Sequence, residues 1–131
     1  MVTFSVHSMN RQEFLDITHK ISEAVLDSGI NNGVVVIFTP HTTAGLTINE
    51  NADPDVLKDL NFTFNTVFPN KKEYRHIEGN SDSHMKSTVT SASLTCVISE
   101  GKLVLGTWQS IYFCEFDGPR TRKIHVQTIK E

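Results

Sequence analysis

Residues 34–38 read VVVIF, a continuous run of β-branched and aromatic side chains. Such residues favour strands, and an unbroken apolar run predicts a central strand that is covered on both faces. Pro40 ends this run, and residues 46–50 (LTINE) predict a further short strand. Upstream, residues 2–7 (VTFSVH) alternate apolar and polar side chains, which predicts a half-buried strand.

Two segments have the spacing of amphipathic helices. The first starts at Asn10 and should end at Gly29, because apolar residues recur at three- and four-residue spacing: Phe14, Ile17, Ile21, Ala24 and Val25. The second should start with Asp53 as its cap and Pro54 in the first helical position, followed by Val56, Leu57, Leu60 and Phe64. A polar loop from Phe68 to Asp82 then leads into a short predicted helix near residues 82–91.

The second half of the chain predicts a run of adjacent strands. These strands are expected at residues 93–99, 102–107, 108–116 and 122–129, with turns at Glu100-Gly101 and at Asp117-Gly118-Pro119. Helices early and strands late predict an α+β fold with mostly antiparallel β-sheet layers and two to three helices. At 131 residues, we expect one domain spanning residues 1–131.

Composition limits the partners and the compartment. The net charge is −3 and charged residues make up 21% of the chain, so no overall field attracts nucleic acid or an anionic membrane. The sequence has no apolar run near the roughly 18 residues that span a bilayer, and no signal peptide is expected. Cys96 and Cys114 are too few and too far apart to suggest a disulfide framework. We therefore expect a soluble, cytoplasmic protein with reduced thiols, no nucleic-acid partner and no membrane partner.

Three of the six histidines lie in polar, turn-rich segments, where imidazole adds nothing to a buried core. They are His41 in PHTTAG, His76 in YRHIEGN and His84 in SDSHMKS. Three histidines brought together by the fold could bind a divalent metal such as zinc and leave one coordination position open for water or substrate. These histidines are therefore the predicted metal ligands and catalytic residues.

The residues around the histidines suit an anionic ligand. Thr42 and Thr43 can donate hydroxyl hydrogen bonds, and Lys86 can neutralise a phosphate. Glu78 and Asp82 could act as a general base or orient an imidazole. A solvated turn and an ordinary surface loop are the alternatives for these two segments.

A third candidate segment lies near the C-terminus. Trp108, the single tryptophan, could form a flat wall against a heterocycle. Arg120 and Arg122 should lie on one face of the last strand, since strand side chains alternate, and could grip a phosphate. A small phosphorylated metabolite is therefore the expected ligand. A core tryptophan and a simple hairpin turn remain the alternative.

Three blocks of the chain resemble one known family in order and in spacing. They are HTTAGLTINENADPDVLKDL, YRHIEGNSDSHMKS and GKLVLGTWQSIYFCEFDGPRTRKI, and together they extend the resemblance over about residues 33–129. They are similar to the YjbQ-type family, whose members are described as secondary thiamine-phosphate synthases. The resemblance implies an α+β fold, a homotrimer, and a pocket formed by the three histidines with Asn49, Glu50 and Asp53 nearby. Asn80, in the turn between two of the histidines, joins the residues expected to bind substrate.

Three functions follow as alternatives. The resemblance implies a transferase that joins hydroxymethylpyrimidine diphosphate to thiazole phosphate, for which magnesium is the expected metal. A hydrolase of a small phosphorylated or heterocyclic metabolite would instead use histidine-bound zinc, with Glu50 or Glu78 as the general base. A non-catalytic protein that binds a phosphorylated metabolite or a metal ion is the third alternative.

Overall fold

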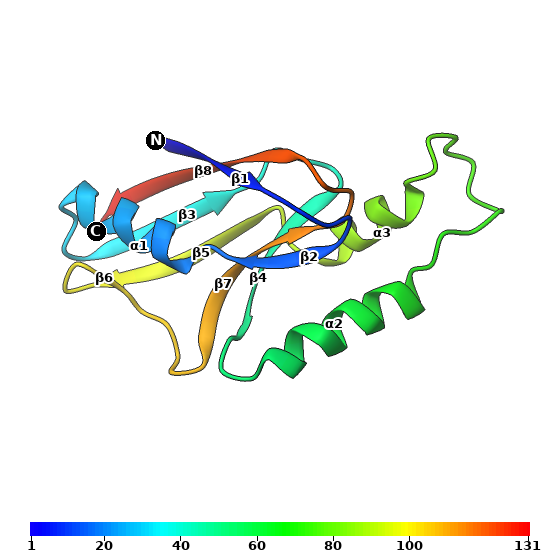
Figure 1. Ribbon diagram of the computed structural model, residues 1–131. Helices are drawn as coiled ribbons and strands as arrows, with labels where there is room; N and C mark the ends of the chain where they lie inside the picture. Colours follow the sequence, from blue (N-terminus) through cyan, green and yellow to red (C-terminus); the bar gives the residue numbers. More distant parts are fainter.

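The computed structural model describes residues 1–131 and contains two antiparallel sheets (Figure 1). One sheet has five strands in the order β1 (Val2–His7), β8 (Thr121–Lys130), β3 (Gly33–Phe38), β5 (Ser93–Ser99) and β6 (Lys102–Leu103). The other has three strands in the order β2 (Glu13–Asp16), β7 (Gln109–Glu115) and β4 (Ala44–Glu50). Every pair of neighbouring strands is antiparallel, so the predicted α+β class is confirmed.

Strand β3 lies at the centre of the larger sheet, between β8 and β5, as VVVIF predicted. Val35 and Ile37 are fully buried in the main core, whereas Phe38 is 42% exposed and Val34 is only partly buried. The expectation that both faces of β3 are covered is therefore wrong within the single chain. The core lies on one face, where β3 packs with residues from the smaller sheet such as Leu46 and Phe113.

Three helices complete the fold: α1 (Thr18–Ser28), α2 (Pro54–Val67) and α3 (Ser81–Val89). Helix α1 buries Ile21 and Val25 in the core and ends at Gly29, whose left-handed backbone (φ 68°) suits glycine. Helix α2 begins as predicted, with the Asp53 carboxylate accepting a hydrogen bond from the Asp55 backbone N–H. No helix is long and apolar enough to cross a membrane.

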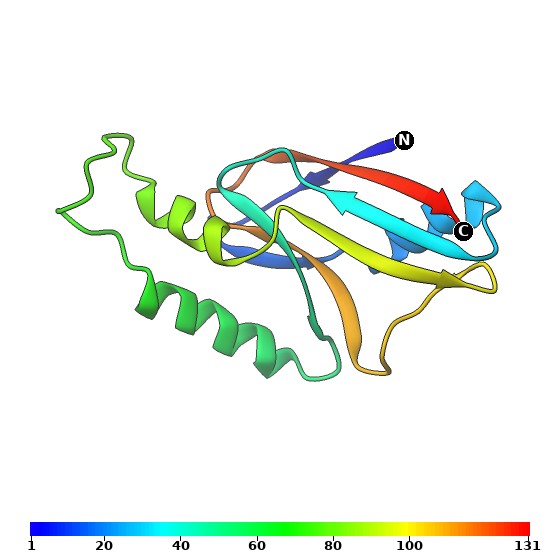
Figure 2. The same cartoon turned by 180° about the vertical axis from the view of Figure 1, so that it is seen from behind.

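A second, aromatic cluster joins α2 to the smaller sheet. The rings of Phe14, Phe64 and Phe116 pack against one another with centroids 5.4–6.2 Å apart, and the Phe64–Phe116 pair is stacked at 5.4 Å. Helix α2 therefore packs through a narrow apolar stripe, and the segment linking it to α3 projects away from both sheets (Figure 2). This projecting segment carries His76 and Glu78.

The first predicted helix starts too early. Residues Glu13–Asp16 form strand β2, which pairs with β7, and α1 begins only at Thr18. Phe14 enters the aromatic cluster while Ile17 enters the main core, so the two residues do not share one helix face. Pairing with β7 has overridden the helical spacing of the apolar residues, and the Asp16 carboxylate accepts a hydrogen bond from the Thr18 N–H where the helix starts.

The strand predicted at 102–107 is shortened to Lys102–Leu103. After β6 only the Val104 N–H still donates to β5, at the Val97 carbonyl, and the chain then crosses from the larger sheet to the smaller one. The Gly106 N–H donates to the side chain of Gln109 instead, which forms the turn into β7.

Candidate functional site

The chain passes from one sheet to the other between β3 and β4, and this crossing carries His41. Thr39 and Thr43, on either side of it, are buried, whereas His41 is half-buried. The His41 Nε2 atom accepts a hydrogen bond from the Lys123 backbone N–H at 2.9 Å. Because a neutral imidazole has one protonated nitrogen, this bond places the proton of a neutral His41 on Nδ1.

Strands β7 and β8, together with the turn between them, bring two carboxylates opposite two arginines. Glu115 faces Arg122, whose Nε atom donates to both carboxylate oxygens at 3.0 and 3.1 Å. Asp117 faces Arg120, with an ion pair of 3.0 Å. We call these four residues the pocket cluster. Glu115 is the last residue of β7 and Arg122 lies on β8, whereas Asp117 and Arg120 belong to the turn between the two strands.

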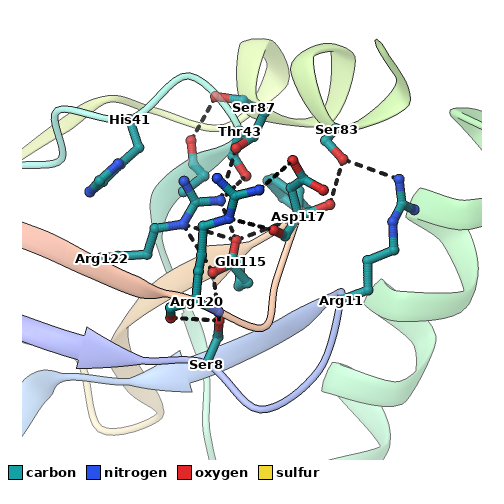
Figure 3. A network of polar contacts seen from close by, with 12 residues as sticks. Ser8, Arg11, His41, Thr43, Ser83, Ser87, Glu115, Asp117, Arg120 and Arg122 are labelled. Carbon is teal, nitrogen blue, oxygen red and sulfur yellow. Dashed lines mark hydrogen bonds and ion pairs between the residues drawn. The ribbon is translucent and has the colours of Figure 1, made fainter. Parts of the chain in front are cut away.

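The inner pair of the pocket cluster is fully enclosed. The side chains of Glu115 and Arg122 are 0% and 3% exposed. Ser8 donates to Glu115 at 2.7 Å, and Arg122 Nη2 donates to the Thr43 hydroxyl at 2.8 Å (Figure 3). Glu115 and Thr43 thus bind the Nε and Nη2 atoms of Arg122. The third guanidinium nitrogen, Nη1, makes no hydrogen bond with the protein.

Asn80 and the other two histidines approach the pocket cluster from the start of α3. Asn80 Nδ2 donates to Asp117 at 2.8 Å. The rings of His76 and His84 lie edge to face with centroids 5.1 Å apart, and His76 Nε2 is 3.8 Å from Glu78. These contacts bring the second predicted segment to the same place as the first and the third.

Together these residues enclose a polar pocket of about 320 Å³. Its lining contains no apolar side chain other than the ring of one proline: Pro40, His41, Thr42, Thr43, Glu78, Asn80, His84, Asp117, Arg120 and Arg122. Eight of these ten residues, all except Pro40 and Asp117, were predicted to bind substrate or act in catalysis. His76 does not line the pocket but touches His84 from outside.

The electrostatics of the pocket favour a neutral histidine beside a fixed ion pair. Burial lowers the pKa of His41 below its ordinary value, and the nearby charge of Arg122 lowers it further. Burial alone would raise the pKa of Glu115, but hydrogen bonds from Arg122 and Ser8 outweigh it and keep the pKa low. At neutral pH, Glu115 is therefore ionised and His41 is uncharged.

Lys86, predicted to neutralise a phosphate, lies elsewhere. Its side chain is 1% exposed, and its Nζ atom donates to Gln12 and Asn65, both at 2.7 Å, with Asp82 at 3.6 Å. Asp82 also forms a two-point ion pair with Arg11 at 3.1 Å. We call Arg11, Asp82 and Lys86 the helix cluster, because it ties α3 to α2 and to the chain before β2. The prediction for Lys86 is corrected: its charge is used inside the fold.

Four further predicted residues lie far from the pocket within one chain. Asn49 and Glu50 are at the opposite end of β4 from Thr43, where Asn49 pairs with Ser110 of β7. Asp53 caps α2, and Trp108 lies in the turn before β7, 62% exposed, with its backbone carbonyl bound by Asn51. Trp108 is therefore neither a core residue nor a wall of this pocket.

No three histidine, cysteine, aspartate or glutamate side chains of the single chain gather closely enough to hold a metal ion. His41 Nε2 is engaged by the Lys123 backbone, and only His76 and His84 lie side by side. The residues of one chain thus do not fit a three-histidine centre. That centre stays a prediction.

Glu115, Asp117 and Ser8 are the residues in and behind the pocket that the sequence analysis did not identify. The stretch EFDGPRTR contained a signal for the ion pairs, since acidic and basic residues occupy matching positions on both sides of the turn. Ser8 gave no signal, because it lies 107 positions from Glu115 in the sequence.

The fold and the pocket define a class of protein: two antiparallel sheets with three helices and a polar pocket of histidines and arginines. The chain matches the family described as UPF0047 protein YjbQ-like over residues 2–131, and it belongs to that family. The resemblance that the three sequence blocks indicated is thus confirmed at the level of the family.

Relatives and solved structures agree with this assignment. YugU of Bacillus subtilis is 49% identical over 126 residues, which cover 95% of this chain and 96% of the relative. A UPF0047 protein of Methanocaldococcus jannaschii is 46% identical, with coverage of 96% and 91%. A crystal structure of a family member from Clostridium acetobutylicum has a TM-score of 0.96 at 50% identity, covering 98% and 100% of the two chains. A YbjQ-like protein of unknown function from Sulfolobus solfataricus has a TM-score of 0.94 at 33% identity, covering 99% and 96%.

Proposed function

We propose that the polar pocket binds a small phosphorylated metabolite and that the protein is an enzyme that hydrolyses it. The observation that carries this proposal is Arg122, a buried cation with an unused Nη1 donor group on the pocket wall. Arginine donors match the oxygens of a phosphate, and a phosphate would satisfy the donor that the protein leaves free. The wholly polar lining suits such a ligand better than it suits a flat apolar ring.

The histidines bind the phosphate and transfer the proton in this proposal. His41, neutral and protonated on Nδ1, donates a hydrogen bond to a phosphate oxygen and keeps its proton. His84, which lines the pocket together with Glu78, takes up the proton of the attacking water and returns it to the leaving alcohol oxygen, so that the ester and water give an alcohol and inorganic phosphate. Arg120 and Arg122 stabilise the negative charge that builds up on the phosphate.

The test of this proposal is release of inorganic phosphate from a panel of small phosphate monoesters. His84→Gln should lower the rate by about two to four orders of magnitude, the usual contribution of a general base. His125→Gln is the matched control, because His125 is a surface histidine bound to Thr3 on β1. Equal rates in the His84 variant and in wild type would rule out this catalytic role.

Thiamine-phosphate synthase activity is a second candidate, favoured by the order and spacing of the three sequence blocks. It would use the same arginines for the diphosphate, but the pocket lining offers no flat apolar wall for a pyrimidine. The assay is release of pyrophosphate from hydroxymethylpyrimidine diphosphate and thiazole phosphate, with and without magnesium. Pyrophosphate release here, without phosphate release from the monoesters, would favour the synthase over the hydrolase.

The homotrimer remains a proposal from the resemblance. It would give Asn49, Glu50, Asp53 and Trp108 a role in the site only if a neighbouring copy brought them to the pocket. Light scattering on the purified protein tests this directly, because a monomeric mass would leave those four residues outside the site.

A further inference from the structure

The polar pocket presents side chains of both charges to a ligand. Its walls carry two arginines, Arg120 and Arg122, and two carboxylates, Glu78 and Asp117. A third carboxylate, Glu115, lies directly behind Arg122 and pairs with it. Because two positive groups face three negative ones, the site has no surplus of positive charge for a ligand that is only an anion. Electrostatic complementarity therefore favours a ligand that also brings a positive charge.

Both carboxylates of the pocket wall have an oxygen that the protein does not use. Asp117 Oδ2 accepts hydrogen bonds from Asn80 and Arg120, at 2.8 and 3.0 Å, but Asp117 Oδ1 accepts none. The side chain of Glu78 is 72% exposed, and the only basic atom within 4 Å of it is His76 Nε2, at 3.8 Å. An ionised carboxylate can only accept hydrogen bonds, so these oxygens are available to a donor group of a ligand.

The groups that suit a phosphate lie apart from these carboxylates. His41 Nδ1 carries the proton of the neutral ring, and Arg122 Nη1 makes no hydrogen bond with the protein, so both can donate to phosphate oxygens. His41 and Asp117 lie on opposite sides of the two arginines (Figure 3). Glu78 belongs to the projecting segment between α2 and α3, whereas His41 belongs to the crossing between β3 and β4. The pocket thus has a donor side and an acceptor side.

We propose that the ligand is an aminoalkyl phosphate, a zwitterion that carries a phosphate and an ammonium group. Its phosphate binds on the donor side and its ammonium group on the acceptor side, at Glu78 and Asp117. An ammonium group fits there better than a neutral hydroxyl, because Glu78 has no arginine partner and attracts a positive charge. The charge of Arg120 is offset by Asp117, 3.0 Å away. This inference rests on the phosphate binding proposed above and adds the class of substrate.

Phosphorylethanolamine and propyl phosphate form a matched pair of probes, because they differ only in an ammonium group that replaces a methyl group. Calorimetric titration of wild-type protein should give an affinity for phosphorylethanolamine that is higher by about fivefold, the contribution of a well-formed exposed ion pair. The titrations contain EDTA, so that no metal ion supplies the positive charge. Glu78→Gln should bring this ratio close to one, because it removes the carboxylate that no arginine offsets.

Glu73→Gln is the matched control, because Glu73 is exposed on the same projecting segment but does not line the pocket, so the ratio should stay unchanged. Equal wild-type affinities for the two esters, or a ratio that survives in Glu78→Gln, would overturn the inference. Glycerol 3-phosphate, which carries neutral hydroxyls, should bind more weakly than phosphorylethanolamine, and equal affinity would also overturn it. Failure of all three esters to bind would instead remove the phosphate-binding proposal, and this inference with it.

Discussion

The pocket cluster and the helix cluster contain the same kinds of charged group but use them differently. In the helix cluster, Lys86 has three oxygen partners and Asp82 is bound by Arg11, so every charge is engaged within the fold. In the pocket cluster, Arg122 is equally buried, but its Nη1 atom makes no hydrogen bond with the protein. A satisfied buried cation stabilises the structure, whereas a buried cation with a free donor is available to a ligand.

This difference explains why Arg122 is available to a ligand whereas Lys86 is not. From sequence alone both were candidate phosphate ligands, because both are basic residues within polar motifs. Lys86 and Arg122 differ in their hydrogen-bond partners and not in burial, since their side chains are 1% and 3% exposed. The free energy of unfolding should therefore depend on Lys86, whereas ligand affinity should depend on the arginines.

The largest effect is expected from removing the charge of Glu115. Glu115→Gln leaves Arg122 as an unpaired charge in the interior, and breaking a buried ion pair from one side costs about 3–5 kcal/mol. The free energy of unfolding, measured by urea titration, should fall by about this amount. Glu23→Gln on the exposed face of α1 is the control and should change it by less than about 0.5 kcal/mol.

Lys86→Met tests the other cluster. It removes the ammonium group that donates to Gln12 and Asn65, and one hydrogen bond to a charged group contributes about 1.5–3 kcal/mol to stability. Removing the desolvation cost of the buried charge offsets part of the loss of the two bonds. We expect a loss in that range in the same urea experiment, with unchanged affinity for inorganic phosphate. Lower phosphate affinity without loss of stability would mean that Lys86 faces the ligand after all.

Acid should weaken both clusters. Burial raises the pKa of Asp82, but the hydrogen bond from Arg11 and the nearby charges outweigh it, so the pKa of Asp82, like that of Glu115, is lowered by folding. A lowered pKa stabilises the fold above the unfolded pKa of about 4, and this stabilisation is lost as the pH falls through the lower, folded value. The free energy of unfolding should therefore fall below about pH 4, at up to about 1.4 kcal/mol per pH unit and per group. Urea titrations of wild type and Glu115→Gln should show a shallower fall in the variant, and parallel curves would contradict the role given to Glu115.

Arg120→Met should have the smallest effect on stability. The Arg120 side chain is 50% exposed, and exposed ion pairs contribute at most about 1 kcal/mol. Its loss should still weaken phosphate binding by about tenfold, which corresponds to about 1.4 kcal/mol, because it removes one of the two arginines on the pocket wall. Thermal unfolding and a phosphate titration of the same sample separate the two effects.

Much of the fold follows from local sequence signals, and the exceptions have one cause. The strand at VVVIF, the Asp53-Pro54 helix start and the helix end at Gly29 are predicted correctly because each depends on its neighbours in the chain, whereas the predicted covering of both faces of β3 is wrong. Residues 13–16 were misassigned because the decisive contact, pairing with β7, comes from about 100 positions away. Local periodicity cannot report such a contact.

The predictions for the site residues divide in the same way, between local signals and contacts made by the fold. His41, His84, Arg120 and Arg122 were found because their residue types are informative, and the fold brings them together. Glu50 and Trp108 were grouped with them, although the length of β4 separates them from the pocket in one chain. The free Nη1 atom of Arg122 and the satisfied state of Lys86 depend on three-dimensional partners, so no pattern in the sequence could have revealed them.

The most direct test of the difference between the clusters is a crystal structure of the protein with inorganic phosphate. We expect a phosphate in the polar pocket, with an oxygen within hydrogen-bond distance of Arg122 Nη1, and an undisturbed Lys86 still bound to Gln12 and Asn65. A saturating phosphate concentration that leaves only water beside Arg122 Nη1, or a phosphate bound at Lys86, would contradict the assignment of the pocket cluster to ligand binding.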